Sequence, residues 1–199
     1  MIYFLYLLDQ ILDMKKVALT RLFGLLLWMV CSGLLGQNQI KSIYDLRNET
    51  ITSIAQDDDG AIWFSTLRGV IKFSGSYSTY YFPGRQTDNS ISTANNFDLL
   101  FDSEGVLWVA HYSGLDKIMP NKRIDRIRFN MNITPIRKLA EMDSVRMVIS
   151  TNNGLSILDK MEEEIICSYQ NPVISNSRLL QITSQNHIWV ASDFNNVVM

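Results

Sequence analysis

The stretch from Ile51 to Phe73 reads ITSIAQDDDGAIWFSTLRGVIKF and decides the fold of this chain. It contains short runs of apolar and β-branched residues, and the dipeptide Asp59-Gly60 separates the first two runs. Glycine tolerates the positive φ of a tight turn, so Asp-Gly between two such runs is a strong β-hairpin signal. The stretch therefore predicts three short strands, over Ile51–Gln56, Ile62–Ser65 and Val70–Phe73.

Two landmarks of this stretch return along the chain at a common interval. The anchor position in the second strand moves by 45, 40 and 41 residues and is occupied by Trp63, Trp108, Val148 and Trp189. The position six residues later moves by the same steps and is occupied by Gly69, Gly114, Gly154 and Asn195. A repeat of about 40 residues is typical of β-propellers or of helical arrays.

The residue pattern within each repeat favours the propeller. Each copy holds short β-type runs with turn residues between them, and no helical stripe of useful length competes. We therefore expect an all-β chain, a partial β-propeller of about four four-stranded blades after an N-terminal signal helix. The blades are predicted at 51–82, 97–129, 135–168 and, incomplete, 178–199. The anchor tryptophan should fill the space between adjacent blades, and the trailing glycine should turn the chain where a Cβ would clash.

The N-terminal residues have the pattern of an export signal. Lys15, Lys16 and Arg21 precede an apolar run over 22–35 that ends in Gly36. This pattern predicts a secretory signal peptide over 1–36, with Met14 as a possible true start, and a mature chain over 37–199. Lipid attachment at Cys31 and an uncleaved membrane anchor are alternatives, although the apolar run is short for a spanning helix.

Composition narrows the class of partner and site. The formal net charge of −2 gives no broad attraction to phosphate, so nucleic acid is an unfavourable partner. Cys167 is the one cysteine outside the signal region, so the predicted mature chain offers no intramolecular disulfide or cysteine metal site. Its neighbours Ile-Ile and Ser-Tyr predict a buried strand thiol. No serine stands in a nucleophile-elbow pattern.

The repeat resembles the two-component regulator propeller repeat. That pattern is an aspartate, a glycine three later, a tryptophan three later again, then Thr and Gly-Leu. The first copy matches through Asp57, Gly60, Trp63, Thr66 and Gly69-Val70. The second matches through Asp102, Gly105, Trp108 and Gly114-Leu115. The later copies keep only Thr151, Gly154-Leu155 and Trp189.

This resemblance implies a periplasmic sensor. Such repeats form the sensor regions of hybrid histidine kinases in Bacteroides-like bacteria, where many sense glycans. We therefore expect an exported, ligand-sensing segment, from a truncated gene, without catalytic, cofactor or metal residues of its own. Partners expected are a glycan or other small ligand, further blades, or a second copy, with the membrane reached only through an uncleaved signal. A secreted propeller enzyme (a glycosidase or lyase) and a structural protein-interaction propeller are the alternatives.

Several residues could have a functional role, although a structural role is favoured for each. Asp57-Asp58-Asp59-Gly60 could suggest calcium, but it lacks the alternate oxygen spacing and the later glutamate, so a turn is favoured. The Asp-box of sialidases would need an aspartate at Ser103. His111 and His187 have no paired carboxylate or second histidine at metal spacing and are expected to be structural or surface residues. A sugar could stack on Tyr77, Tyr80, Tyr81 or Phe82, although an outer-strand role is favoured. Open sheet edges predict an oligomerising or aggregating product.

Overall fold

The structure is a computed structural model that describes residues 48–84, 90–129, 135–192 and 197–198, together with Arg21 and Leu46. The chain divides into two compact units, 1–44 and 45–199, and every described strand belongs to the second. The signal peptide predicted over 1–36 lies outside the described residues apart from Arg21. In the part of the chain that the structure describes, no helix is long and apolar enough to cross a bilayer.

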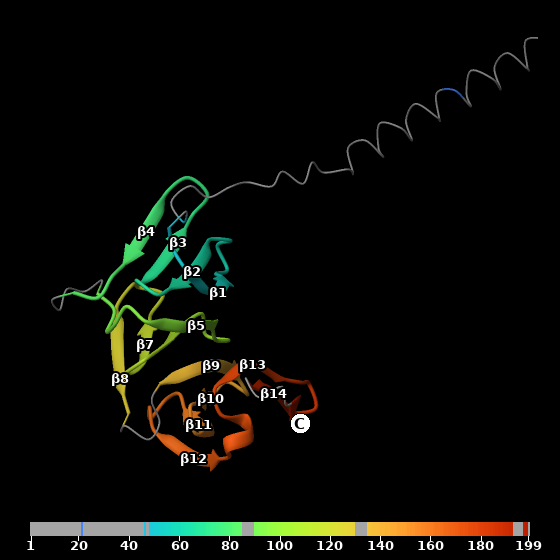
Figure 1. The fold of residues 1–199 in the computed structure, drawn as a ribbon. Helices are drawn as coiled ribbons and strands as arrows, with labels where there is room; N and C mark the ends of the chain where they lie inside the picture. The colour runs from blue at the N-terminus through green and yellow to red at the C-terminus, as the bar shows by residue number, and fades with distance from the viewer. Residues whose placement is uncertain are drawn as a thin grey trace, which may run out of the picture. The chain divides into compact units, whose positions relative to one another are not determined.

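The second unit is built of antiparallel sheets whose strands follow one another in chain order (Figure 1). The first sheet contains β1 (Ile51–Gln56), β2 (Ile62–Thr66), β3 (Val70–Phe73) and β4 (Ser78–Tyr81). The second contains β5 (Asn96–Phe101), β6 (Leu107–His111), β7 (Gly114–Ile118) and β8 (Ile124–Arg128). The third contains β9 (Ile136–Glu141), β10 (Arg146–Thr151), β11 (Gly154–Asp159) and β12 (Ile165–Gln170). We call these sheets blades 1, 2 and 3.

The fourth sheet, blade 4, has three described strands. They are β13 (Ser177–Ile182), β14 (Ile188–Ser192) and the two-residue β15 (Val197–Val198), and a short 3₁₀ helix over Pro172–Ile174 precedes them. The all-β prediction is confirmed, and the three strands predicted in the first repeat lie within one residue of their predicted bounds. The strand-forming runs and the turn residues between them were sufficient to place these strands because each hairpin is local in sequence.

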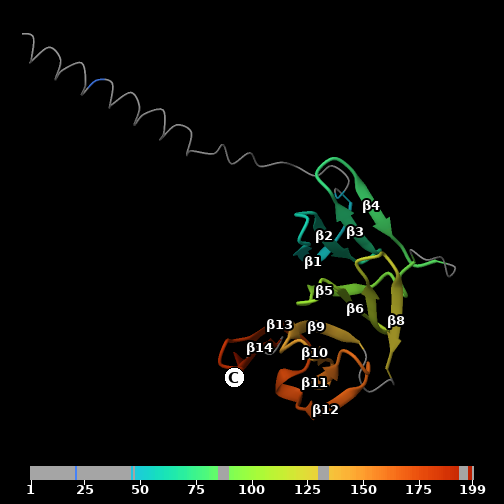
Figure 2. The same ribbon diagram turned by 180° about the vertical axis from the view of Figure 1, so that it is seen from behind.

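The blades pack face to face through their first strands. β1 lies against β5, β5 against β9, and β9 against β13 (Figure 2). Each of two hydrophobic clusters joins two neighbouring blades: Trp63 packs with Leu99 and Val109, and Trp108 packs with Ile136 and Leu139. We call the side of a blade turned to the next blade its forward face, and the opposite side its backward face. The landmark tryptophans of blades 1 and 2 lie on forward faces, as the sequence predicted.

The trailing glycines stand where two strands of one blade approach closely. A Cβ at Gly114 would lie 2.3 Å from the carbonyl oxygen of Ile127, and one at Gly154 would lie 2.1 Å from that of Tyr169. Both glycines also have positive φ angles, 146° and 140°. Any side chain at these positions would push the fourth strand of the blade away from the third.

Candidate functional site

The aspartate of each well-preserved repeat holds its tryptophan. Asp57 accepts hydrogen bonds from the Ala61 backbone N at 2.8 Å and from the indole Nε1 of Trp63 at 2.9 Å. Asp102 repeats both contacts, with the Val106 backbone N at 3.0 Å and with Nε1 of Trp108 at 2.8 Å. Gly60 and Gly105 complete the turns at φ 81° and 75°. The spacing of aspartate, glycine and tryptophan therefore closes a hairpin and orients the ring that the next blade covers.

The threonine landmark caps the turn at the other end of the blade. The hydroxyl of Thr66 accepts a hydrogen bond from the backbone N–H of Arg68 at 3.0 Å. The hydroxyl of Thr151 accepts one from the backbone N–H of Asn153 at 3.1 Å. In blade 2 the ring nitrogen Nδ1 of His111 accepts the backbone N of Ser113 at 3.2 Å. Because Nδ1 is the acceptor, Nε2 is inferred to carry the proton, and it lies 3.5 Å from Asp116. His111 is buried, and its ring accepts the turn hydrogen bond that a threonine hydroxyl accepts in blades 1 and 3.

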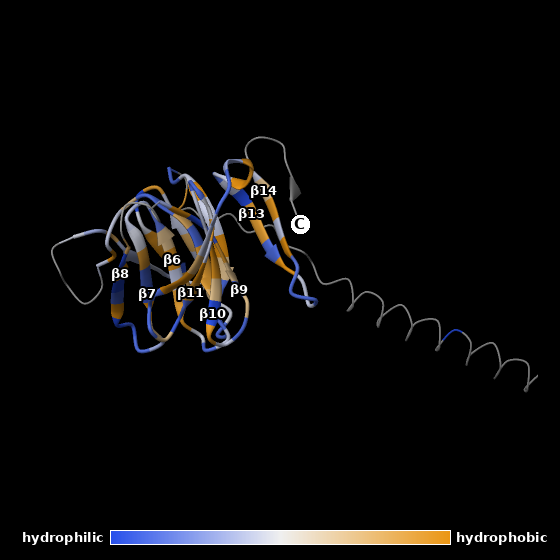
Figure 3. Cartoon of the chain, turned by 90° about the horizontal axis from the view of Figure 1, so that it is seen from below, coloured by the Kyte–Doolittle hydropathy of each residue, from blue (hydrophilic) through white to orange (hydrophobic). Residues whose placement is uncertain are grey.

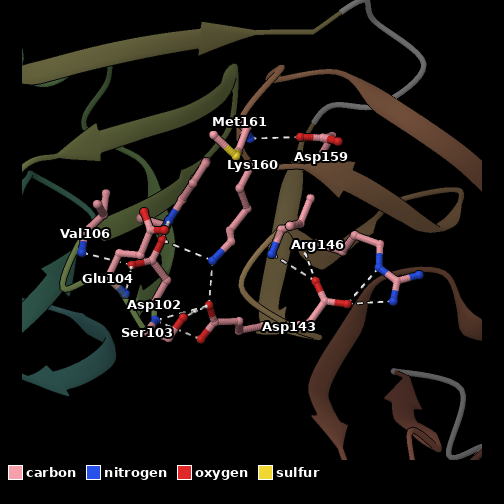
Figure 4. A network of polar contacts seen from close by, with 12 residues as sticks. Asp102, Ser103, Glu104, Val106, Asp143, Arg146, Asp159, Lys160 and Met161 are labelled. Carbon is pink, nitrogen blue, oxygen red and sulfur yellow. Dashed lines mark hydrogen bonds and ion pairs between the residues drawn. The ribbon is translucent and has the colours of Figure 1, made fainter.

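Blades 2 and 3 are joined by a polar network at the end of the sheets that carries the β5–β6 and β11–β12 turns (Figure 4). The ammonium of Lys160 lies 2.5 Å from Glu141 and 3.4 Å from Asp102. Glu141 also accepts the backbone N of Ser103 at 2.9 Å. Burial disfavours the charged ammonium, but the carboxylates of Glu141 and Asp102 outweigh burial and raise the pKa of Lys160 above its ordinary value. The aspartate that orients Trp108 is thus also an inter-blade contact.

The same end of blades 1 and 2 carries a cleft made of two adjoining pockets of about 360 and 470 Å³. The β1–β2, β3–β4, β5–β6 and β7–β8 turns line it, since all four lie at the same end of their antiparallel sheets. The residues common to both pockets are Asp59, Lys72, Tyr81 and Lys122. We call this the turn-side cleft.

The lining of the turn-side cleft combines aromatic rings with charged side chains. The Tyr81 ring stacks on Trp63 at a centroid distance of 5.4 Å, and burial raises the pKa of Tyr81. The Lys72 ammonium lies 4.9 Å from the Trp63 ring and 2.8 Å from Asp57. Burial acts to raise the pKa of Asp57, but hydrogen bonds from Lys72, Trp63 and Ala61 outweigh it and lower the pKa. The cleft therefore presents fixed charges of both signs beside apolar rings.

Free hydrogen-bonding capacity in the cleft comes from its outer residues. Asp58 and Asp59 of blade 1 and Glu104 and Lys122 of blade 2 are exposed and line the cleft, and Tyr77, which also lines it, is 65% exposed. Among the described residues, no group of three or more acidic, histidine or cysteine side chains is placed to hold a metal ion. An arrangement of carboxylates, lysines and tyrosine suits a hydroxyl-rich organic ligand.

The four aromatic residues in and beside the outer strand of blade 1 have three different surroundings. Tyr81 is buried at 3% exposure against Trp63 and belongs to the core. Tyr80 and Phe82 stack on each other at 5.6 Å and are both exposed. Tyr77 alone of the four borders the turn-side cleft with its side chain largely exposed.

One residue is placed differently from its sequence interpretation. Cys167 was predicted to be a buried strand thiol, and this is wrong, because the residue is exposed. It lies in β12, the outermost strand of blade 3, whose residues from Ile166 to Gln170 are all exposed. Alternation within a strand predicts burial only where another layer covers the strand. His187, the other histidine, is exposed directly before β14.

The sequence interpretation missed two features of the site. The aspartate was read as a turn residue only, although its constant spacing of six from tryptophan in blades 1 and 2 was a visible signal for an Asp–indole bond. The contribution of Lys122 to a cleft with Asp59 had no such signal, because it depends on how blade 2 packs on blade 1.

Comparison with known proteins starts from the first repeat. Residues 45–68 match the family described as Two component regulator propeller. Among curated proteins, none matches the chain in sequence.

Solved structures share the arrangement of blades. The extracellular domain of a hybrid two component system from B. thetaiotaomicron is 20% identical, with a TM-score of 0.62 over 76% of this chain and 21% of that chain. The extracellular domain of a one component system from the same organism is 16% identical, with a TM-score of 0.63 over 75% of this chain and 25% of that chain. Virginiamycin B lyase from Staphylococcus aureus, in a catalytically inactive form with quinupristin, is 12% identical, with a TM-score of 0.61 over 80% of this chain and 58% of that chain.

These likenesses show the fold. The chain spans between about a fifth and a quarter of the length of the two sensor-system domains that it matches. It carries a two-component regulator propeller repeat, and its sheets are arranged as propeller blades.

Proposed function

We propose that this chain, with its two-component regulator propeller repeat, is part of an exported ligand-sensing propeller of a two-component system. The observation that carries the proposal is the repeat itself, in which Asp57 and Asp102 each hold the tryptophan six residues later. The sensor-system domains with the same fold support it, as does the signal-like N-terminal sequence. The proposed location is the periplasm or the periplasmic side of the inner membrane.

The proposed task is binding rather than catalysis. The two histidines have structural placements, since His111 caps a turn in the interior and His187 is exposed away from the cleft lining. The lyase with the same fold keeps a secreted enzyme as the alternative class, but the described lining of the turn-side cleft contains no histidine or cysteine to act as a base or nucleophile.

The proposed ligand is a glycan, and the proposed place is the turn-side cleft. Exposed carboxylates at Asp58 and Asp59 can accept hydrogen bonds from sugar hydroxyls, and Lys122 can donate to their oxygens. Tyr77 offers an exposed ring at the rim for stacking. The pocket volumes of about 360 and 470 Å³ are those of small-ligand sites.

A panel of neutral and uronic-acid oligosaccharides tests this function. The purified protein is titrated with each sugar by calorimetry, and we expect at least one to bind. Tyr77→Ala and Lys122→Ala should each weaken that binding by about tenfold, the cost of one lost stacking or charge-assisted contact.

Tyr112→Ala is the matched control. Tyr112 is 62% exposed, close to the 65% of Tyr77, but it lies in the β6–β7 turn at the opposite end of its sheet. Its replacement should leave affinity unchanged. Binding that responds to Tyr112 and not to Tyr77 would move the site to the other end of the blades, and no binding by any sugar would reject the glycan.

A further inference from the structure

The turn-side cleft offers a ligand more negative charge than positive charge. The turns at the ends of the blades are coloured mainly hydrophilic in Figure 3, and hydrophobic colour lies mostly within the strands. Four charged side chains of the cleft lining are exposed and form no hydrogen bond or ion pair with any described residue: Asp58, Asp59, Glu104 and Lys122. The cleft therefore presents three free carboxylates and one free ammonium.

The other charged residues of the lining are already engaged inside the protein. The Lys72 ammonium lies 2.8 Å from Asp57. Asp102 lies 3.4 Å from Lys160, and Lys160 is shared with Glu141, so this network adds no positive charge to the cleft. Only the free groups can answer the charge of a ligand, and three negative charges against one positive charge leave a net charge of −2.

The lining also contains a built example of how an ammonium is held here. The Lys72 ammonium lies between the carboxylate of Asp57 and the ring of Trp63, whose centroid is 4.9 Å away. A carboxylate together with an aromatic ring is a general arrangement for binding an amine. The free carboxylates and the Tyr77 ring, which is 65% exposed, offer the same two kinds of partner to a ligand.

We infer that the turn-side cleft selects, among glycans, an oligosaccharide that carries a free amino group. The inference rests on the glycan function proposed above and adds the charge of the ligand to it. A sugar ammonium donates charge-assisted hydrogen bonds to the free carboxylates, whereas a neutral sugar makes only ordinary ones. A uronic acid brings a further carboxylate to a cleft that is already negative, and like charges repel. The expected order of affinity is amino sugar, then neutral sugar, then uronic acid.

The test compares two sugars that differ only in this charge. A β-1,4-linked glucosamine disaccharide and its N-acetylated form share ring, linkage and hydroxyl groups, but the acetyl group converts each amine to a neutral amide. Calorimetry is run at about pH 6, where Asp and Glu are ionised and an amine with the pKa of an α-amino group is protonated. We expect the amine form to bind about tenfold more tightly. Raising the salt concentration should reduce this difference, because salt screens exposed charges.

Replacements that remove charge and keep shape locate the effect. Asp59→Asn and Glu104→Gln should each weaken binding of the amine form about threefold to fivefold and leave the acetylated form within about twofold. A loss of cleft structure would weaken both sugars together. Glu162→Gln is the matched control, because Glu162 is exposed in the β11–β12 turn of blade 3, outside the lining of the cleft. It removes the same charge from the protein and should change neither affinity.

The possible results separate this inference from the glycan function on which it rests. Equal or tighter binding of the acetylated disaccharide, or tighter binding of a uronic-acid disaccharide, would overturn the amine preference and leave a glycan ligand in place. An equal loss in Asp59→Asn, Glu104→Gln and Glu162→Gln would show that overall charge attracts the amine, which would also overturn the inference. Binding of no sugar by the unchanged protein would reject the glycan function and the inference together.

Discussion

Blades 2 and 4 carry a tryptophan at the same place in the second strand, yet the two side chains have opposite surroundings. Trp108 is 1% exposed and donates its indole N–H to Asp102. Trp189 is 41% exposed, and the residue six before it is Thr183, which has no carboxylate. The difference teaches that this tryptophan depends on two partners outside its own strand. One is the turn aspartate, and the other is the blade that follows.

Replacing each tryptophan by alanine should give the largest difference between the two blades. Trp108→Ala removes a ring buried between blades 2 and 3 and should lower the free energy of unfolding by about 4 kcal/mol. Trp189→Ala should lower it by less than about 1 kcal/mol, because the ring is already partly in water. Urea denaturation at low protein concentration measures both. Equal losses would show that packing against the following blade does not determine how much the tryptophan contributes to the free energy of unfolding.

The glycine of blade 2 should be the next most sensitive position. Gly114→Ala places a Cβ 2.3 Å from the Ile127 carbonyl at a φ of 146°, and we expect a loss of about 3 kcal/mol. Gly84→Ala is the matched control, because a Cβ there meets nothing within 4 Å. Thermal melting of both variants tests this, and a stable Gly114→Ala protein would mean that β7 and β8 can separate without cost.

The turn residues of blades 2 and 4 should differ by a smaller amount. Asp102→Ala leaves the Trp108 indole and the Val106 amide without their acceptor and should cost about 2 kcal/mol. Thr183→Ala removes one exposed hydrogen bond, which the His187 backbone N–H donates to the Thr183 hydroxyl at 3.2 Å, and should cost about 0.5 kcal/mol. Denaturant midpoints of the two variants provide the comparison. A larger cost for Thr183→Ala would contradict the role given to the aspartate.

The smallest expected effect is the loss of stability at high pH that follows when Lys160, in the network between blades 2 and 3, loses its proton. Glu141 and Asp102 raise the pKa of Lys160 in the folded protein above its unfolded value of about 10.4. The stabilisation is therefore fully present below about pH 10 and is lost as pH rises through the raised folded pKa. The stability difference between the parent and Lys160→Met should shrink above that pH. A difference that stays constant up to pH 12 would contradict the assignment.

Local signals in the sequence were enough for the blades. The runs around Trp63 and Trp108, with Gly60 and Gly105 between strands, place hairpins whose two strands are neighbours in sequence, so no long-range information is needed. Even the worn fourth copy keeps its turn, because Asn186 adopts the positive φ of 60° where glycine stands in blade 1.

Features that depend on packing between blades could not be read in this way. The exposure of Cys167 follows from the absence of a layer over β12 among the described residues, and the cleft follows from Lys122 of blade 2 lying near Asp59 of blade 1. Both depend on which sheets pack against each other and where, which no single repeat encodes. The hydrogen bond between Asp102 and Trp108 is an intermediate case. The sequence shows the constant spacing of the two residues, but it does not show that their side chains meet.

A double-mutant cycle across the junction of blades 1 and 2 tests most directly whether the repeat tryptophan joins one blade to the next. Trp63 of β2 and Phe101 of β5 meet edge to face, with ring centroids 5.9 Å apart. Urea denaturation of Trp63→Ala, Phe101→Ala and the double variant should give a coupling of about 1 kcal/mol, typical of a buried aromatic pair. Effects that simply add, with a coupling below about 0.3 kcal/mol, would contradict the account.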